Sequence, residues 1–300
     1  MINVHHLYLF HQVAAARGFT RAAEQLYISQ PALSRQVHEL EQELGVPLID
    51  RVGRRICLTE AGETLFEYTT RLFGLIDEIE TVMRDTRGLQ RGRLAIGAST
   101  TIGMYVIPAT LAQYRATYSG IDMRVEIGNT RQIADAVLRC ELELGLVEGP
   151  IDHPQLAVEP LATDELLVIL PPNHTLAGRT ELRPTDLAEQ PFVLREPGSG
   201  TRLVADTYLR SAGIVPHVVL ELGSTEAIKR LIMAGVGLGI ISRYAVVHEI
   251  ESGRLAAARL IGMRMTRGFS RITLRSRRLS LAARAFNTML DTALRSSAAA

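Results

Sequence analysis

Apolar residues recur at helical spacing over the first 45 positions, and they define three faces that can pack against one another. The first face comprises Val4, Leu7, Phe10, His11 and Val13. The second comprises Ala22, Ala23 and Leu26, and the third comprises Leu33, Val37 and Leu40. The paired alanines let a neighbouring helix approach closely. This pattern predicts an amphipathic first helix, followed by two short helices that are joined by a tight turn.

Capping residues mark the ends of the two short helices. Thr20 can cap the start of the first, and Ser29 can cap the start of the second. Pro31 would then lie in the first helical turn, where a missing N–H group costs nothing. Gly45, with Pro47 just beyond it, is typical of the end of a helix.

The outward positions at the start of the second short helix carry side chains that suit DNA. They are Gln30, Ala32, Ser34, Arg35 and Gln36. Glutamine pairs with adenine, arginine with guanine or phosphate, serine with either, and alanine contacts the thymine methyl group. The helix pair therefore predicts a helix-turn-helix whose second helix enters a major groove. The residues expected to contact DNA from it are Thr20, Ser29, Gln30, Pro31, Ser34, Arg35 and Gln36.

A basic hairpin is predicted directly after the helix pair. Gly53 lies at its turn, and Arg51, Arg54 and Arg55 surround that glycine. A lone run of this kind is usually a solvated loop, but beside a recognition helix it is typical of a wing that grips the DNA backbone. Residues 1–60 carry six arginines and six acidic residues, so their net charge is zero. DNA binding would therefore depend on local placement of charge and on a second copy of the domain.

A stripe of apolar residues at heptad spacing predicts one long helix from about Thr59 to Thr86. The stripe comprises Leu58, Leu65, Leu72, Ile76, Ile79 and Met83, with Gly62 and Thr69 completing the seam. One interpretation is a helix that lies on its own domain. The other, favoured by the length of the helix and the small size of the preceding domain, is dimerisation through Leu65, Leu72, Ile76, Ile79 and Met83. Residues 87–92 should then break the helix.

Beyond residue 92 the pattern changes to alternating strands and helices. Strands are expected at residues 94–98, 123–127, 142–147, 165–170, 192–194, 218–222, 238–241 and 271–274. Helices are expected at residues 102–118 and 130–139 and from residues 201, 225 and 281 onward. Repeated β–α units imply an α/β fold with parallel sheets covered by helices. Two such series indicate two lobes with a cleft between them.

Three turns between a strand and a helix are candidate ligand contacts, because the free N–H groups at helix starts attract anions. They span residues 99–101, 195–202 and 223–225. In the second turn Gly198 and Gly200 let backbone N–H groups point inward, and Arg195 or Arg202 can supply a positive charge. The alternative is plain helix capping by the hydroxyl residues. The expected effector-binding residues are Ser99, Thr100, Thr101, Glu148, Ser199, Gly200, Thr201 and Arg202.

Composition excludes several other classes of protein. The formal net charge of the 300 residues is +1, no run of eighteen apolar residues exists, and the N-terminus lacks the basic start of a signal peptide. Two cysteines, Cys57 and Cys140, are too few for a disulfide scaffold or a zinc site. No GxSxG elbow is present, and the glycines at 235–239 follow a helix rather than a strand. We therefore expect a cytoplasmic protein that is not an enzyme and has no cofactor, metal or membrane partner.

The segment FTRAAEQLYISQPALSRQVHELEQELGVPLIDR, followed by LTEAG, resembles the LysR-type transcriptional regulators, and the resemblance covers the whole chain. Ile49 replaces the phenylalanine that is usual in the family, which is a conservative core change. The resemblance implies a winged helix-turn-helix and a linker helix that pairs with another subunit's. It also implies an effector domain similar to type II periplasmic binding proteins, with strand crossovers near Ala162–Glu165 and Met265–Ser270.

The resemblance also implies partners and a division of the chain. We expect a winged helix-turn-helix at 1–58, a linker helix at 59–88 and an effector domain at 89–300. Lobe I of that domain would cover about 91–162 and 267–300, and lobe II about 163–266. The segments ASTTIG, LGLVEGP and REPGSGTR are similar to the branch that regulates carbon-dioxide fixation and sulfur assimilation. This similarity implies a small anionic metabolite such as a sugar phosphate, a nucleotide cofactor or sulfite.

The expected partners are double-stranded promoter DNA, that metabolite, further copies in a homodimer or homotetramer, and RNA polymerase. The alternatives are a solute-binding protein and an α/β enzyme, each with an accessory N-terminal domain.

Overall fold

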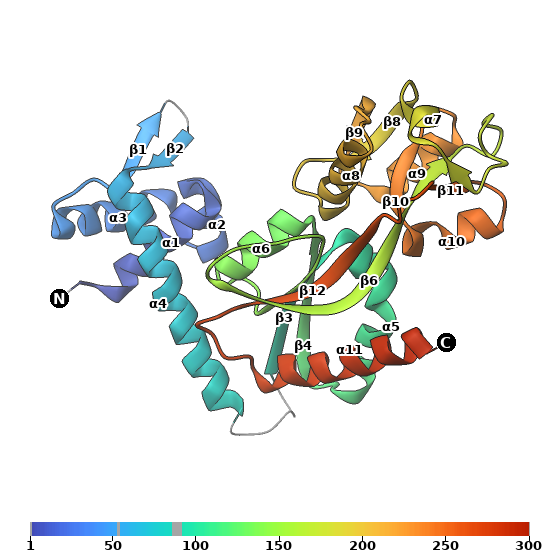
Figure 1. The fold of residues 1–300 in the computed structure, drawn as a ribbon. Helices are drawn as coiled ribbons and strands as arrows, with labels where there is room; N and C mark the ends of the chain where they lie inside the picture. Colours follow the sequence, from blue (N-terminus) through green and yellow to red (C-terminus); the bar gives the residue numbers. More distant parts are fainter. Residues whose placement is uncertain (1, 53–54, 86–91, 300) are drawn as a thin grey trace. The chain divides into compact units, whose positions relative to one another are not determined.

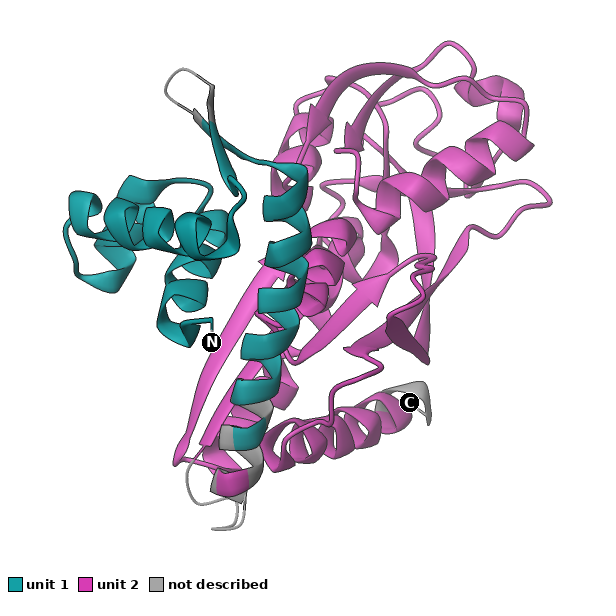
Figure 2. Cartoon of the chain, turned by 90° about the vertical axis from the view of Figure 1, so that its left-hand side faces the viewer, with its two compact units in different colours: residues 1–80 teal, residues 81–300 magenta. Residues whose placement is uncertain are grey.

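The computed structural model describes residues 2–52, 55–85 and 92–299 (Figure 1). The chain divides into two compact units, Met1–Glu80 and Thr81–Ala300 (Figure 2). No helix among the described residues is long and apolar enough to cross a membrane.

The first unit contains the three predicted helices and the predicted hairpin. They are α1 (Val4–Ala16), α2 (Phe19–Leu26), α3 (Gln30–Leu44), β1 (Ile49–Val52) and β2 (Arg55–Leu58). The two strands pair antiparallel. The core of the unit is formed by the expected faces and includes Phe10, Val13, Ala22, Ala23, Leu33, Val37 and Leu40, all buried. The helical periodicity of the sequence thus identifies this core, but the inclusion of Val4 is wrong: it is the first residue of α1 and is 52% exposed.

The helix ends agree with the sequence at α3 and differ at α2. The Ser29 side chain accepts a hydrogen bond from the Ala32 N–H group, and Gly45 ends the helix with a φ of 72°. By contrast, α2 begins one residue before Thr20, and Gly18 precedes it without a side-chain cap. The prediction that Thr20 caps α2 is therefore wrong, because packing of Phe19 against the core brings that residue into the helix.

The long helix α4 (Glu60–Asp85) starts where the second strand of the hairpin ends. The Thr59 hydroxyl donates to the Pro47 carbonyl and accepts from the Gly62 N–H group, which caps the helix. A Cβ added at Gly62 would lie 2.0 Å from the Leu48 carbonyl oxygen. Glycine at position 62 therefore allows the first turn of the helix to pass directly against the backbone that leads into the wing.

The apolar stripe on α4 divides into two parts. Leu65 and Leu72 pack against the core of the first unit, as the interpretation of a helix on its own domain requires. Ile76, Ile79 and Met83 are 37%, 54% and 61% exposed. Leu58, predicted as the first residue of the stripe, lies in β2 instead. The second half of the helix thus has exposed apolar side chains at Ile76, Ile79 and Met83, and Tyr68 in the first half is 62% exposed.

The second unit is built on a mixed sheet. Its strands are β3 (Gly92–Ser99), β4 (Ile121–Gly128), β5 (Leu144–Glu148), β6 (Leu156–Leu170), β7 (Glu181–Leu182), β10 (Gly239–Ser242), β11 (Ala256–Leu260) and β12 (Thr266–Leu274). The order is β4-β3-β5-β12-β6-β11-β7, with β10 also paired to β6. A separate parallel pair joins β8 (Pro191–Arg195) to β9 (His217–Leu222). The predicted parallel pairing holds for β3, β4 and β5, whereas β12 is antiparallel to β5 and β6.

Two groups of helices with separate cores define two lobes (Figure 1). Lobe I contains β3–β5, the π-helical turn η1 (Ile102–Val106), α5 (Pro108–Thr117), α6 (Thr130–Leu138) and α11 (Leu281–Ala299). Lobe II contains β7–β11 with α7 (Pro184–Leu187), α8 (Gly200–Ser211), α9 (Thr225–Met233) and α10 (Arg243–Glu251). The single helix predicted at 102–118 is wrong, because Pro108 lacks the N–H group that would continue it and the chain forms an Ile107-to-Ile102 π-turn first.

Strands β6 and β12 run antiparallel through both lobes and connect them (Figure 1). Both expected crossovers lie within these strands, so each connection is a continuous strand rather than a loop. At the crossover, Arg267 of β12 is the register partner of Asp164 of β6. The hinge between the lobes therefore carries opposite charges on directly facing positions.

Candidate DNA-binding surface and effector site

The N-terminal half of α3 combines a buried face with an exposed polar face. Leu33 and Val37 are buried, while Gln30, Pro31 and Ala32 are exposed. The Arg35 side chain is 82% exposed, and its Nε donates to Glu39 Oε1 at 3.0 Å on the next turn. Ser34 and Gln36 are half-buried. The outward residues expected from the sequence thus lie on one side of the helix, where base edges and phosphates can reach them.

The turn that joins α2 to α3 adds one residue that the sequence did not indicate. Tyr27 is 95% exposed and adopts a left-handed backbone conformation with a φ of 55°. It projects from the same turn as Ser29, while Thr20 is exposed on α2. The sequence offered one signal for this exposure, namely that Tyr27 lies outside the apolar face formed by Ala22, Ala23 and Leu26.

The predicted wing is present as the β1–β2 hairpin, with Val52 facing Arg55 in register. Gly53 and Arg54 lie outside the described residues, and so do the side chains of Arg51 and Arg55. The hairpin follows α3 directly along the chain, as a winged helix-turn-helix requires.

In the second unit, the predicted effector residues gather around two buried arginines. The first, Arg267, has a fully buried side chain. Its Nε donates to Asp164 Oδ2 at 2.8 Å, and its Nη2 lies 2.9 Å from Glu148 Oε2. Its Nη1 donates to Thr201 Oγ1 at 2.7 Å and its Nη2 to Thr101 Oγ1 at 3.1 Å. One guanidinium at the hinge therefore binds hydroxyls from both lobes.

The second arginine, Arg195, ends β8 and is 3% exposed. Its Nη2 donates to Thr100 Oγ1 of lobe I at 3.3 Å, and its Nη1 donates to Thr225 Oγ1 at the start of α9 at 3.2 Å. Its Nε and Nη2 bind the two oxygens of Glu196 at 2.7 and 3.0 Å. This guanidinium also spans the lobes.

One of the predicted effector-binding residues, Ser99, has a side-chain hydroxyl without a hydrogen-bond partner among the described residues. Ser99 Oγ is buried, and none of the described residues hydrogen-bonds to it. Glu148, at the end of the neighbouring strand β5, is 1% exposed. A buried hydroxyl without a partner costs about 1–3 kcal/mol, so a ligand or an ordered water is the expected partner of Ser99 Oγ.

Burial dominates the electrostatics of the hinge. It raises the pKa of the Asp164 carboxyl above its usual range, although Arg267 and Ser242 act in the opposite direction. At Glu196 burial likewise works to raise the pKa, but the hydrogen bonds and charge of Arg195, together with Asn129, outweigh it and leave the pKa below its usual range. Arg267 therefore offsets part of the effect of burial on the Asp164 carboxyl.

The two lobes are closed on each other. The Arg131 N–H group of lobe I donates to the Gly198 carbonyl of lobe II at 3.2 Å. A Cβ added at Gly200 would lie 1.8 Å from the Glu148 carbonyl oxygen, so only glycine allows this approach. On the other side of the hinge, the Tyr105 hydroxyl donates to Glu226, which also pairs with the buried Lys229. These contacts join the lobes on both sides of the hinge.

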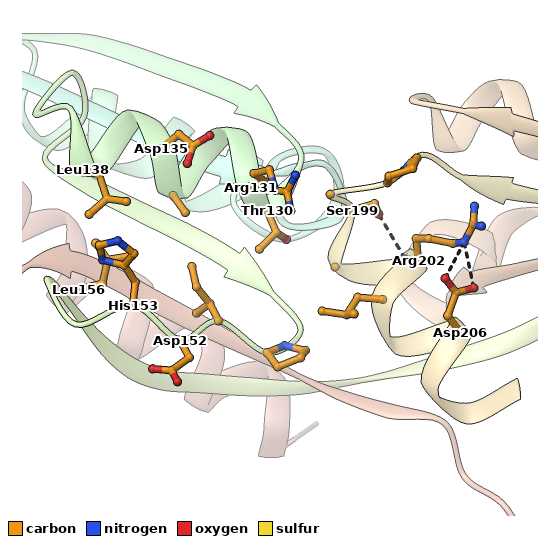
Figure 3. Close-up of a pocket in the computed structure, with 17 residues that line it drawn as sticks. Thr130, Arg131, Asp135, Leu138, Asp152, His153, Leu156, Ser199, Arg202 and Asp206 are labelled. Carbon is orange, nitrogen blue, oxygen red and sulfur yellow. Dashed lines mark hydrogen bonds and ion pairs between the residues drawn. The ribbon is translucent and has the colours of Figure 1, made fainter. Parts of the chain in front are cut away.

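The remaining predicted residues, Ser199, Gly200 and Arg202, line a cavity of about 480 Å³ next to this cluster. Figure 3 shows Thr130 and Arg131 of α6 on one side and Ser199 and Arg202 on the other. The Arg202 guanidinium donates to Asp206 at 2.9 Å and to Glu221 at 2.6 Å. Its charge is therefore compensated within lobe II. By contrast, Arg195, the other arginine considered for this turn, and Arg267, which the sequence did not indicate, both contact lobe I.

No group of three metal-ligating side chains occurs among the residues that the structure describes. The guanidinium, hydroxyl and amide donors at the hinge suit anions, and the carboxylates of Asp164, Glu148 and Glu196 already bind to the two arginines.

Comparison with known proteins assigns both units to one class. A model described as the bacterial regulatory helix-turn-helix protein, lysR family, matches residues 4–63, and the LysR substrate binding domain matches residues 87–295. The RuBisCO operon transcriptional regulator of Allochromatium vinosum is 33% identical over 285 residues, which are 95% of this chain and 94% of that protein.

Solved structures agree with these matches. The regulatory domain of CcmR from Synechocystis PCC6803, in complex with 2-PG, is 30% identical and superposes with a TM-score of 0.64, covering 68% of this chain and 98% of that one. Full-length OxyR from Pseudomonas aeruginosa is 23% identical and superposes with a TM-score of 0.74, covering 98% of this chain and 95% of that one. The second likeness concerns the fold alone.

Proposed function

Because this chain belongs to the LysR family of bacterial transcriptional regulators, we propose that its oligomer binds promoter DNA through α3 and the wing, and that a small anionic metabolite bound between the lobes controls this binding. The family consists of regulators rather than enzymes, and the similarity to a regulator of a RuBisCO operon agrees with the branch indicated by the sequence. We propose the domain limits 1–58, 59–88 and 89–300 for the winged helix-turn-helix, the linker helix and the effector domain.

The observation that supports DNA reading is the separation of the two faces of α3. Its apolar residues are buried in the core of the first unit, while Gln30 and Arg35 remain exposed at its N-terminal half. Glutamine and arginine are the side chains that form bidentate hydrogen bonds with adenine and guanine, each worth about 1–3 kcal/mol of discrimination. Tyr27 and the arginines of the wing would add backbone contacts.

A dimer follows from the exposed half of α4. Ile76, Ile79 and Met83 extend beyond the part of the helix that packs on the first unit. Burial of an apolar side chain contributes about 1.5–3 kcal/mol, so pairing with another copy would stabilise the assembly. Two copies would also supply the phosphate contacts that one domain of zero net charge lacks.

The effector site is proposed at the hinge, where Arg195 and Arg267 lie with Ser99, Thr100, Thr101 and Thr201. Two guanidinium groups and several hydroxyls suit a carboxylate or phosphate group. CcmR, which is 30% identical, was solved in complex with 2-PG, and we propose an effector of the same anionic kind for this chain. Its binding would change lobe closure, and lobe closure would change the spacing of two recognition helices.

Fluorescence anisotropy with the DNA upstream of the coding sequence tests the regulator proposal. Arg35→Ala should weaken binding to that DNA by about 1–3 kcal/mol at a stated salt concentration, and should weaken binding to random DNA much less. Arg21→Ala, an exposed arginine on α2, is the matched control. Absence of binding, or an equal loss on both DNA sequences, would show that α3 does not read bases.

A further inference from the structure

The Glu196 carboxylate occupies the side of Arg195 that suits an anion best. Arg195 Nε and Nη2 bind its two oxygens at 2.7 and 3.0 Å. Two parallel hydrogen bonds of this kind are the geometry by which a guanidinium recognises a carboxylate or a phosphate. The two parallel donors of Arg195, at the proposed effector site, are therefore already occupied by the carboxylate of Glu196.

A donor from the opposite lobe binds the same carboxylate. Asn129, which caps α6 in lobe I, donates from Nδ2 to Glu196 Oε1 at 3.2 Å. Three donors from two lobes thus surround one carboxylate group. This set would serve equally well for an anion that is not part of the chain, and it would then join the lobes in the same way.

Arg195 and Glu196 differ in how firmly they are held. The Arg195 side chain is 3% exposed and is fixed by Thr100 and Thr225 in addition to Glu196. The Glu196 side chain is 24% exposed, and its polar partners among the described residues are Arg195, Asn129 and its own backbone N–H group. The carboxylate can therefore rotate into solvent without disturbing the core, and the receptor that it leaves would remain in place.

We propose that Glu196 is an internal counter-ion in the anion subsite, and that an effector binds by displacing it from Arg195 and Asn129. This inference rests on the proposed effector site. Replacement of one anion by another keeps the buried guanidinium compensated, so the charge balance of the closed lobes is preserved. The competing carboxylate has a high effective concentration, because it is attached to the neighbouring residue. Glu196 would therefore exclude neutral compounds and weak anions, and it would set the affinity of the site.

Calorimetric titration of the full chain with 2-PG, and separately with inorganic phosphate, at fixed ionic strength tests this proposal. Glu196→Gln keeps the size of the side chain but removes its charge, so 2-PG should bind about tenfold more tightly than to the wild type. Glu141→Gln is the matched control, because Glu141 binds Arg139 at 2.7 Å in a pair that is about 40% exposed and lies outside the subsite, and it should change the affinity less than twofold. Arg195→Lys, which keeps the charge but removes the fork, should weaken binding in every background.

The outcomes separate this inference from the proposed function. If Arg195→Lys weakens anion binding but Glu196→Gln and Glu196→Ala bind no more tightly than the wild type, then the effector site stands and the role of Glu196 is refuted. If neither probe binds to the wild type or to either Glu196 variant, both the effector site and the inference are overturned. Circular dichroism of each variant would verify that the lobes are folded.

Discussion

Replacing Arg267 with methionine should destabilise the effector domain strongly. The Arg267 side chain is fully buried, and so is that of its partner Asp164. Methionine fills a similar volume but leaves the carboxylates of Asp164 and Glu148 buried without their cation. Removal of one partner from a buried ion pair costs about 3–5 kcal/mol. For a domain of this size we expect the melting temperature to fall by on the order of 10 °C.

The pH dependence gives this prediction a definite sign. Burial already raises the pKa of Asp164 in the wild type, and Arg267 acts against that rise. In the variant the pKa should rise further, so the folded state binds a proton more tightly than the unfolded state does. Protonation then relieves the buried charge, and the loss of stability should be largest at neutral pH and should shrink as the pH falls through the raised pKa.

Thermal unfolding of the wild type and the variant over a series of pH values provides the measurement. Arg264→Met is the matched control, because Arg264 is 70% exposed and pairs with Glu165 at 3.2 Å. A surface pair contributes about 0–1 kcal/mol, so this control should melt within about 3 °C of the wild type. If Arg267→Met melts as the control does, or if its loss of stability grows at lower pH, the account of the hinge is wrong.

Three further predictions concern other parts of the chain. Gly200→Ala places a Cβ 1.8 Å from the Glu148 carbonyl oxygen and should keep the lobes apart. Amide hydrogen exchange around residues 148 and 200 should then be at least about tenfold faster, which corresponds to the free energy of about one lost hydrogen bond. Gly178→Ala, with no atom within 4 Å of the added Cβ, should leave exchange unchanged, and equal effects in the two variants would refute the closed arrangement. Lys229→Met leaves Glu249 without its 3.0 Å partner and should cost about 2 kcal/mol in urea unfolding, whereas an unchanged midpoint would show that the buried lysine is not required. Ile79→Glu should shift the sedimentation of the protein toward the monomer, whereas the control Thr64→Glu, at an exposed position in the first half of α4, should not. An unchanged oligomer in the Ile79 variant would exclude the exposed half of α4 as the dimer contact.

The sequence predicted the parts of the fold that depend on local periodicity. The core of the first unit follows from Leu33, Val37 and the other helical repeats, and Ser29 and Gly45 correctly mark the ends of α3. The start of α2 was missed because packing of Phe19, which is a tertiary contact, decides it. The mixed sheet was missed for a similar reason, since β–α alternation does not reveal that β12 returns antiparallel between β5 and β6.

The candidate effector site shows the same limit. The hydroxyl residues Thr100, Thr101 and Thr201 could be found because they stand at starts of helices after strands. Arg267 could not, because it lies within strand β12 rather than in a turn, and it meets Asp164 only through strand register across about a hundred residues of sequence. The sequence favoured Arg202 as the effector-binding cation because it lies in a glycine-rich turn. Its charge is instead compensated by Asp206, one helical turn away, and by Glu221 of a separate strand.

Linkage between the two units is the central claim, and a footprint of the upstream DNA in the absence and presence of 2-PG tests it most directly. If the anion changes lobe closure and lobe closure changes the spacing of two recognition helices, then 2-PG should alter the length of the protected DNA or the affinity for it, typically by a factor of about 5–150. Arg195→Lys should abolish the response while retaining DNA binding. An identical footprint and affinity with and without 2-PG, at concentrations that saturate the chain by calorimetry, would contradict the account.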